Sequence, residues 1–318
     1  MVFASEYQNQ PILVAGDDEG IPTVEEISQK FNGLPRRRVP IDCSRVTCFI
    51  DVQKKLLPWV VVAWADGFTG YVIDYGTWPD QKRARWTLSD ARITLAHKFP
   101  KAGLEGAIYA ALEAATEELL GGVYQRDDGA EVKIDRCLID ANWGQSTDVV
   151  YQFCRSSRHA AILLPSHGKG ITASNVPMVE YKRKKGERLG HNWRIPAVTG
   201  KRQVRHVLYD TNYWKSFIFA RLAVALGDAG CLSLFGRSPH RLFAEQLHAE
   251  YPVKTEGRGR TVHEWKQKPN HPDNHWLDGV VGCAVAASMC GVALMGNTAK
   301  AAPPAEKKKP ARNRVSYL

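Results

Sequence analysis

The sequence has no apolar run long enough to cross a membrane and no recognisable secretory signal. Its longest apolar stretch, residues 277–295, is interrupted by Asp278, Ser288 and several glycines, which predicts a buried helix. Residues 1–20 contain neither the basic segment nor the apolar segment of a signal peptide. We therefore expect a protein that works inside a cell.

The sequence also shows no sign of a disulfide framework and no phosphate-binding loop. Its seven cysteines are an odd number, lie mostly in apolar runs, and so indicate reduced core residues rather than disulfides. No second Cys or His pair stands at the spacing of a zinc site. Residues 168–172 resemble the loop Gly-x-x-x-x-Gly-Lys-Ser/Thr only in composition, so we expect no ATPase activity from this chain.

The composition is that of a basic, globular protein. Hydrophobic residues make up 44% and charged residues 24%, which is too apolar for a disordered chain. Subtracting 33 acidic from 43 basic residues gives a net charge of +10. A polyanion is therefore the expected partner, either a nucleic acid or an anionic membrane surface.

Composition also divides the chain into segments. Residues 1–40 are turn-rich and predict an N-terminal arm, and residues 298–318 have the Pro- and Lys-rich composition of a disordered basic tail. Residues 41–297 remain as one folded domain. Within it, residues 165–201 are rich in Gly, Lys and Arg and predict a basic insertion, which is either a solvated loop or a DNA-contacting surface.

The pattern within the folded domain is mixed α/β. Strand-like runs at residues 46–52, 59–65 and 70–75 predict an antiparallel meander, and helical spacing follows at residues 104–120. A strand at 137–140, a helix at 147–155 and a strand at 160–164 predict a parallel β-α-β unit. Further on we expect a strand at 204–209, helices at 212–226, 239–249 and 276–294, and a hairpin near 261–265.

Two carboxylates follow buried strands. Asp51 comes after Cys48-Phe49-Ile50, and Asp140 comes after Leu138-Ile139. If the two strands are parallel neighbours, both side chains emerge at one sheet edge, where a Mg²⁺ or Mn²⁺ ion would offset their repulsion. The alternative is that each Asp caps its turn.

The last predicted helix opens with a second pair of candidate ligands. His275 and Asp278 are three residues apart and so share one helical face. The alternative is that Asp273 or Asp278 serves only to cap the helix or to interact with its dipole.

In combination, these residues resemble the nuclease domain of bacteriophage large terminase subunits of the GpA type. The matching segments are Glu6 to Pro11, Val46-Thr47-Cys48-Phe49-Ile50-Asp51-Val52-Gln53, Tyr71 to Gly76, Leu138-Ile139-Asp140-Ala141-Asn142-Trp143-Gly144 with Val149 to Cys154, Tyr213-Trp214-Lys215-Ser216 and Asn274-His275-Trp276-Leu277-Asp278. The resemblance extends over roughly residues 5–294, and its motifs are specific only together.

The resemblance implies a ribonuclease H-like fold, with a five-stranded mixed sheet flanked by helices. It implies that Asp51, Asp140, Asp278 and His275 form the catalytic and metal-binding site, with two Mg²⁺ or Mn²⁺ ions. Many terminases have an acidic residue in place of His275, and His275 with Asp278 is similar instead to the His-x-x-Asp of RuvC-type resolvases.

The implied function is endonucleolytic cutting of double-stranded DNA during phage genome packaging. The expected partners are DNA, an ATPase motor chain or domain, the small terminase subunit and the portal, with no membrane, in the cytoplasm of the bacterial host. The residues expected to contact DNA phosphates are basic: Lys169, Lys182, Arg183, Lys184, Lys185, Lys201 and Arg202. The alternatives are a Holliday-junction resolvase and a non-catalytic protein that docks DNA or a portal.

Overall fold

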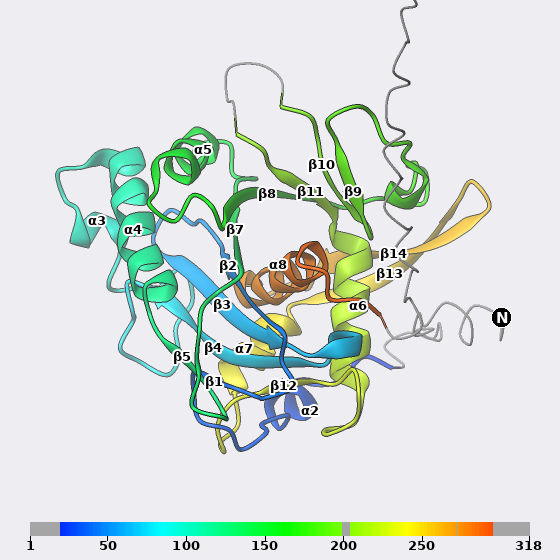
Figure 1. Cartoon of the computed structure of the whole chain (residues 1–318), viewed down its shortest axis with the longest axis horizontal. Helices are drawn as coiled ribbons and strands as arrows, with labels where there is room; N and C mark the ends of the chain where they lie inside the picture. Colours follow the sequence, from blue (N-terminus) through cyan, green and yellow to red (C-terminus); the bar gives the residue numbers. More distant parts are fainter. Residues whose placement is uncertain (1–19, 199–203, 272, 295–318) are drawn as a thin grey trace, which may run out of the picture.

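A computed structural model of the chain describes residues 20–198, 204–271 and 273–294, and the predicted tail 298–318 lies outside them. Within these residues the main sheet has nine strands in the order β12-β4-β3-β2-β7-β8-β11-β10-β9. Their bounds are β12 Leu232–Leu234, β4 Gly70–Trp78, β3 Leu57–Trp64, β2 Arg45–Ile50, β7 Arg136–Asp140, β8 Leu163–Lys169, β11 Val207–Asp210, β10 Trp193–Ile195 and β9 Arg188–Gly190. Figure 1 shows how this sheet runs through the molecule.

The strand directions confirm the predicted antiparallel meander and the predicted parallel β-α-β unit. β2, β3 and β4 form the antiparallel meander, with the turn after β3 made by a short 3₁₀ segment, Asp66–Phe68. β7 lies parallel to β2 on one side and to β8 on the other, with α5 (Thr147–Ser156) as the crossover between β7 and β8. The sheet is therefore mixed, with β2 and β7 at its centre.

The expected five-stranded sheet is wrong in number, because four further strands extend it among the described residues. The five strands β4-β3-β2-β7-β8 are its middle part. β11, β10 and β9 continue the sheet beyond β8, and β12 pairs with β4 at the opposite edge. β11 was expected, as the strand at 204–209, whereas β9, β10 and β12 have three residues each, which is too short for an alternating pattern to be recognised in the sequence.

The region expected to be a surface insertion is partly sheet. The Gly-, Lys- and Arg-rich composition predicted a surface insertion from residue 165, but pairing with both β7 and β11 keeps residues 165–169 extended as part of β8. β9 and β10 also come from this region, so only its middle, including the exposed Lys182 to Lys185, is surface loop.

The described part of the expected N-terminal arm is packed on the body. Helix α2 (Val24–Ser28) begins with a reciprocal capping box between Thr23 and Glu26, buries Ile27, and lies against α7 (Arg241–Leu247). β1 (Arg38–Val39) pairs with β5 (Tyr124–Arg126), which in turn pairs with β6 (Glu131–Val132).

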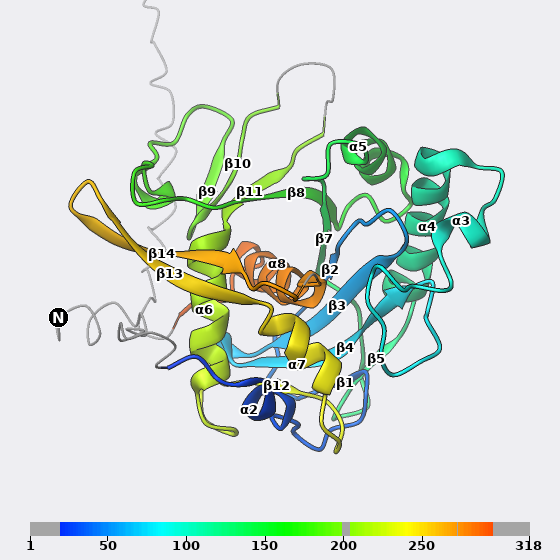
Figure 2. The same ribbon diagram turned by 180° about the vertical axis from the view of Figure 1, so that it is seen from behind.

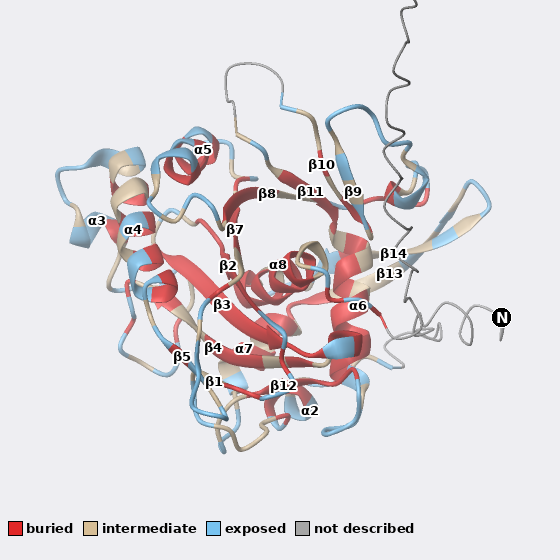
Figure 3. Cartoon of the chain, in the orientation of Figure 1, coloured by how far each residue is buried: buried red, intermediate tan, exposed pale blue. Residues whose placement is uncertain are grey.

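Helices cover both faces of the sheet. Because side chains alternate along a strand, Cys48 and Ile50 face α4 (Gly103–Leu120) and α5, whereas Phe49 faces the opposite core. That second core contains α6 (Thr211–Ala223), α7 and α8 (His275–Met289). Figures 1 and 2 show the two groups of helices on opposite sides of the central strands, and Figure 3 shows that these strands and most of α8 are buried.

Two glycines allow α8 to lie directly on the central strands. A Cβ at Gly282 would be 1.9 Å from Phe49, and one at Gly279 would be 2.5 Å from Val60. The Thr47 hydroxyl also donates to the Cys283 carbonyl at 2.9 Å. The close approach fixes where α8 begins relative to the end of β2.

The remaining elements and cysteines complete the fold. A β-hairpin, β13 (Glu250–Gly257) and β14 (Arg260–Gln267), projects from the body and is longer than predicted (Figure 1). The short α3 (Leu95–Lys98) precedes α4, and a 3₁₀ turn spans Met178–Glu180. All seven cysteines are free thiols, as expected. Among the described residues, none of the helices has the length and apolarity needed to span a bilayer.

Candidate active site

The ends of β2 and β7 bring two carboxylates together. Ile50 pairs with Ile139 in the parallel register, so Asp51 and Asp140 are the next residues on adjacent strands. By alternation each shares the side of Phe49 and Leu138, which is the face covered by α8. The predicted convergence of these two acids at one sheet edge is therefore confirmed.

The first turn of α8 lies over the same edge. His275 is buried, and its Nδ1 is 2.6 Å from Asp51 Oδ2. Asp278 is one turn further along and carries an acidic charge near the positive end of the helix dipole. Asn274, the N-cap, makes no side-chain capping bond, and Asp273 instead accepts from the Leu88 N–H at 2.7 Å. Neither aspartate therefore caps this helix through its side chain.

The two strand-end aspartates also make local bonds. The Asn142 N–H donates to Asp140 at 3.3 Å, so the turn-stabilising alternative holds for Asp140 as well. Asp51 is buried and accepts from the Gln53 amide at 3.0 and 3.1 Å.

The three carboxylates interact electrostatically. Burial and the nearby charge of Asp51 raise the pKa of Asp140 well above its usual range, and Asp278 adds to the rise. Burial also raises the pKa of Asp278, Lys215 opposes this, and Glu250 and Asp51 add to it. The three acids therefore repel one another when they are ionised, and a proton or a bound cation would relieve that repulsion.

A buried lysine is a site residue that the sequence reasoning missed. Lys215, on α6, has its Nζ 2.6 Å from Glu250 Oε1 and 3.2 Å from Asp278 Oδ1. Burial acts to lower the pKa of Lys215, but Asp278 and Glu250 together raise it. Asn274 also donates to Glu250, at 2.6 Å, which joins β13, α6 and α8 in one polar network. A signal existed, because Lys215 interrupts a helix that is apolar on nearly every side.

His275 lies between two carboxylates. Burial disfavours its cation, but the side chains of Asp273 and Asp51 raise the pKa of His275 to about 10. Its Nε2 is 3.7 Å from Asp273 Oδ1 and is a buried atom without a hydrogen-bond partner in the described part of the chain. The ring therefore serves as a cationic partner that holds Asp51.

The donors suit a hard divalent ion, but they are not gathered as a ready ligand set. Carboxylate oxygens are the ligands that Mg²⁺ and Mn²⁺ prefer. Within the described ranges, however, no group of three His, Cys, Asp or Glu side chains is close enough to hold a metal ion. Asp51 Oδ2 is paired with His275 and Asp278 Oδ1 with Lys215, so an ion would have to share these carboxylates with their present partners.

The basic residues expected at DNA lie in different places. Lys169 is exposed at the end of β8, on the same sheet edge as Asp140, because Asp140 pairs with Ser166 three residues earlier. Lys182, Arg183, Lys184 and Lys185 are exposed on the loop before β9. Lys201 and Arg202 lie outside the described residues.

Comparison with known families gives one match. Residues 17–300 match the family described as terminase large subunit gpA, endonuclease domain. The chain belongs to this family. No curated protein and no solved structure gave a significant match. Membership of the gpA endonuclease family supports a nuclease role in phage DNA packaging, and it implies DNA and the packaging machinery as partners in general.

Proposed function

We propose that this gpA-family chain is a divalent-metal-dependent endonuclease that cuts double-stranded DNA during genome packaging. The observation that carries the proposal is the placement of Asp51 and Asp140 on adjacent parallel strands, under the first turn of α8 with Asp278. Repulsion among buried carboxylates is unfavourable unless a cation or a proton neutralises it. Such an arrangement is better suited to holding ions than to stabilising the fold.

Asp51, Asp140 and Asp278 would hold two Mg²⁺ or Mn²⁺ ions, and His275 would adjoin them. A two-ion site stabilises both the attacking and the leaving oxygens when a phosphodiester is displaced in line. The central five strands, with β3 antiparallel to the others, agree with a ribonuclease H-like sheet.

The side chains around the acids would position them. His275 orients Asp51 through the 2.6 Å contact, and Lys215 orients Asp278 while neutralising Glu250. Lys169 and the run Lys182 to Lys185 would contact phosphates, which gives strong salt dependence and weak sequence preference. The motor, the small terminase subunit and the portal would then choose where the cut is made, and ATP hydrolysis would come from a motor rather than from the residues described above.

Plasmid nicking tests this function. The purified chain should nick supercoiled plasmid in Mn²⁺ but not in EDTA, and Asp51→Asn should lower the rate at least about 100-fold, because ion-held charge stabilisation is worth several kcal/mol. Asp42 is exposed and lies shortly before β2. Asp42→Asn is therefore the matched control, and this variant should cleave at the rate of the unaltered chain. Undiminished cleavage by Asp51→Asn would reject the catalytic role of Asp51. No cleavage by the unaltered chain would reject the nuclease function and favour a non-catalytic docking protein.

A junction-resolving nuclease is the second candidate. The observation in its favour is that His275 and Asp278 share the first turn of one helix beside Asp51. Four-way junctions in the same assay separate the two functions. Faster cutting of junctions than of linear duplex would favour the resolvase.

A further inference from the structure

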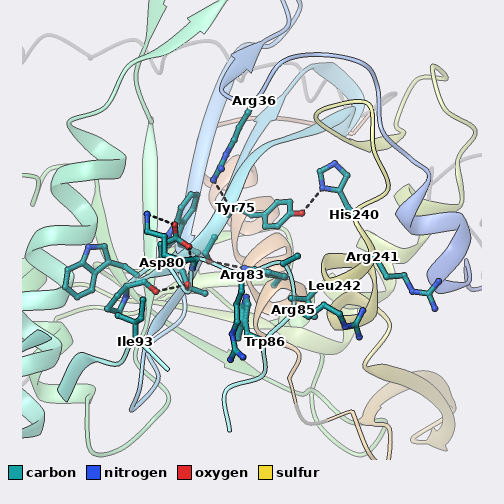
Figure 4. Close-up of a pocket in the computed structure, with 18 of the residues that line it drawn as sticks. Arg36, Tyr75, Asp80, Arg83, Arg85, Trp86, Ile93, His240, Arg241 and Leu242 are labelled. Atoms are coloured by element: carbon teal, nitrogen blue, oxygen red, sulfur yellow. Dashed lines mark hydrogen bonds and ion pairs between the residues drawn. The ribbon is translucent and has the colours of Figure 1, made fainter. Parts of the chain in front are cut away.

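A basic hollow lies beside the candidate active site. Its volume is about 910 Å³, within the range of about 300–1,000 Å³ typical of ligand sites. Its lining includes five arginines and two lysines but only two acids, Asp80 and Glu118. Figure 4 shows Arg36, Arg83, Arg85 and Arg241 around this hollow, and these four residues come from three segments of the chain.

Two residues that line the hollow are neighbours of site residues, although Asp51, Asp140 and Asp278 do not line it themselves. Trp59, in its wall, pairs with Ile50 immediately before Asp51, and Trp276 follows His275. Trp276 donates from its indole to the Gly76 carbonyl at 3.1 Å, which ties α8 to the end of β4. A second hollow of about 470 Å³ shares Arg85 and Arg241 with the first and extends to Asp273, two residues before His275.

Carboxylates hold the arginines in place without covering them. Buried Asp74 accepts from the Nε of both Arg36 and Arg37, and this trio keeps a net charge of +1. Glu245 pairs with Arg85 at 2.8 Å and with Arg241 at 3.1 Å. Arg241 also reaches the exposed Glu25 at 3.1 Å.

Three of the five arginine side chains that line the hollow are more than half exposed. Those of Arg36, Arg85 and Arg241 are 52%, 65% and 58% exposed, respectively. Guanidinium groups fixed in this way lose little freedom when they bind an anion, and their planar forks match phosphate oxygens.

Three tryptophans that line the hollow are closed to stacking. Trp59, Trp86 and Trp276 are buried, and Trp86 and Trp276 pack edge to face with ring centroids 5.4 Å apart. Bases cannot stack on rings that are already covered. The chemistry that the exposed arginines offer to a ligand is that of phosphate recognition, which is independent of base identity.

We propose that this hollow binds backbone phosphates of the DNA strand that continues beyond the cut position, so that it places the scissile phosphate over the acids. The inference rests on the proposed function for its choice of DNA as ligand. Duplex and single-stranded DNA present the same phosphate chemistry, and the experiment separates them.

Binding in EDTA tests the hollow without any cleavage. A fluorescein-labelled 20-base-pair duplex, and one of its strands alone, would be titrated with the chain at several salt concentrations and followed by anisotropy. Arg85→Gln should weaken binding roughly 5- to 10-fold and reduce the salt slope by about 0.9 for duplex or about 0.7 for a single strand. The form with the larger loss is the one that occupies the hollow.

Arg158→Gln is a matched control. Arg158 is also 65% exposed and also paired with one glutamate, Glu117, but it does not line the hollow. It should bind as the unaltered chain does. Lys98→Gln, an exposed change in the hollow's lining, should weaken binding in the same direction as Arg85→Gln.

Equal affinities and salt slopes for Arg85→Gln, Lys98→Gln and Arg158→Gln would overturn the inference, even if the chain cleaves plasmid. Selective weakening with no Mn²⁺-dependent cleavage by the unaltered chain would instead uphold the hollow and reject the proposed nuclease function. Thermal unfolding of each variant verifies that the comparison is made between folded proteins.

Discussion

The same central strands present two different faces to their helices. Toward α4 and α5 the buried residues of β2 and β7 are apolar or thiols, such as Cys48, Ile50 and Ile139. Toward α6 and α8 the strands end in Asp51 and Asp140, and the helices contribute buried charged groups. Apolar burial stabilises a fold directly, whereas buried charges cost free energy unless paired. The difference indicates that one face holds the sheet together and the other is organised for chemistry.

The largest expected effect comes from the anionic edge. Asp140→Asn should lower Mn²⁺-dependent cleavage at least about 100-fold, while the free energy of unfolding stays equal or rises, because burial and repulsion from Asp51 already disfavour this carboxylate. Plasmid nicking and urea unfolding measure the two quantities. A large loss of stability together with the loss of cleavage would show that Asp140 acts structurally.

The buried lysine on α6, Lys215, should matter for both cleavage and stability. Lys215→Met leaves Glu250 and Asp278 without their shared partner and should cost about 3–5 kcal/mol of unfolding free energy, as for other buried pairs broken on one side. Urea unfolding of this variant and of the double variant with Glu250→Gln checks the mechanism. The double variant should be less destabilised than the single one, and the opposite order would contradict the ion-pair account.

The face toward α4 and α5 should show the opposite pattern, in which a substitution lowers stability but not cleavage. Leu112, on α4, is fully buried, so Leu112→Ala should cost about 2–5 kcal/mol through lost burial and a residual cavity. The cleavage rate of the folded fraction should be unchanged at low temperature, since the site lies on the other face. A fall in that rate comparable to the one for Asp140→Asn would break the distinction between the faces.

A smaller, pH-dependent effect is expected at the start of α6. Asp210 caps the helix by accepting from Asn212 and Tyr213, and burial raises its pKa to about 6. Between pH 4 and 6 the folded protein binds more protons at Asp210 than the unfolded chain, so stability should fall by about 2 kcal/mol as pH rises. Asp210→Asn keeps a capping side chain and should lack this slope in urea unfolding. Identical slopes in the two proteins would rule out Asp210 as their source.

Local patterns predicted much of the fold. The alternating runs identified β2, β3 and β4, and helical spacing identified α4, α5, α6 and α8 within a few residues. The short strands β9, β10 and β12 and the packed N-terminal helix α2 were missed, because each is only a few residues long and depends on partners distant in the chain. The sequence predicted that Asp51 and Asp140 converge only if their strands are parallel neighbours. The structure meets that condition, because β2 and β7 are adjacent and parallel.

What the sequence alone determined is the set of groups available for chemistry: acids directly after apolar strands, His275 and Asp278 one turn apart, and a net positive charge. Local spacing fixes these features whatever the fold. Only the tertiary structure decided that Lys215 and Glu250 join them and that arginines from separate segments share one hollow. Those contacts join residues far apart in the chain. The sequence does not distinguish a buried lysine from an exposed one, because burial is decided by tertiary packing.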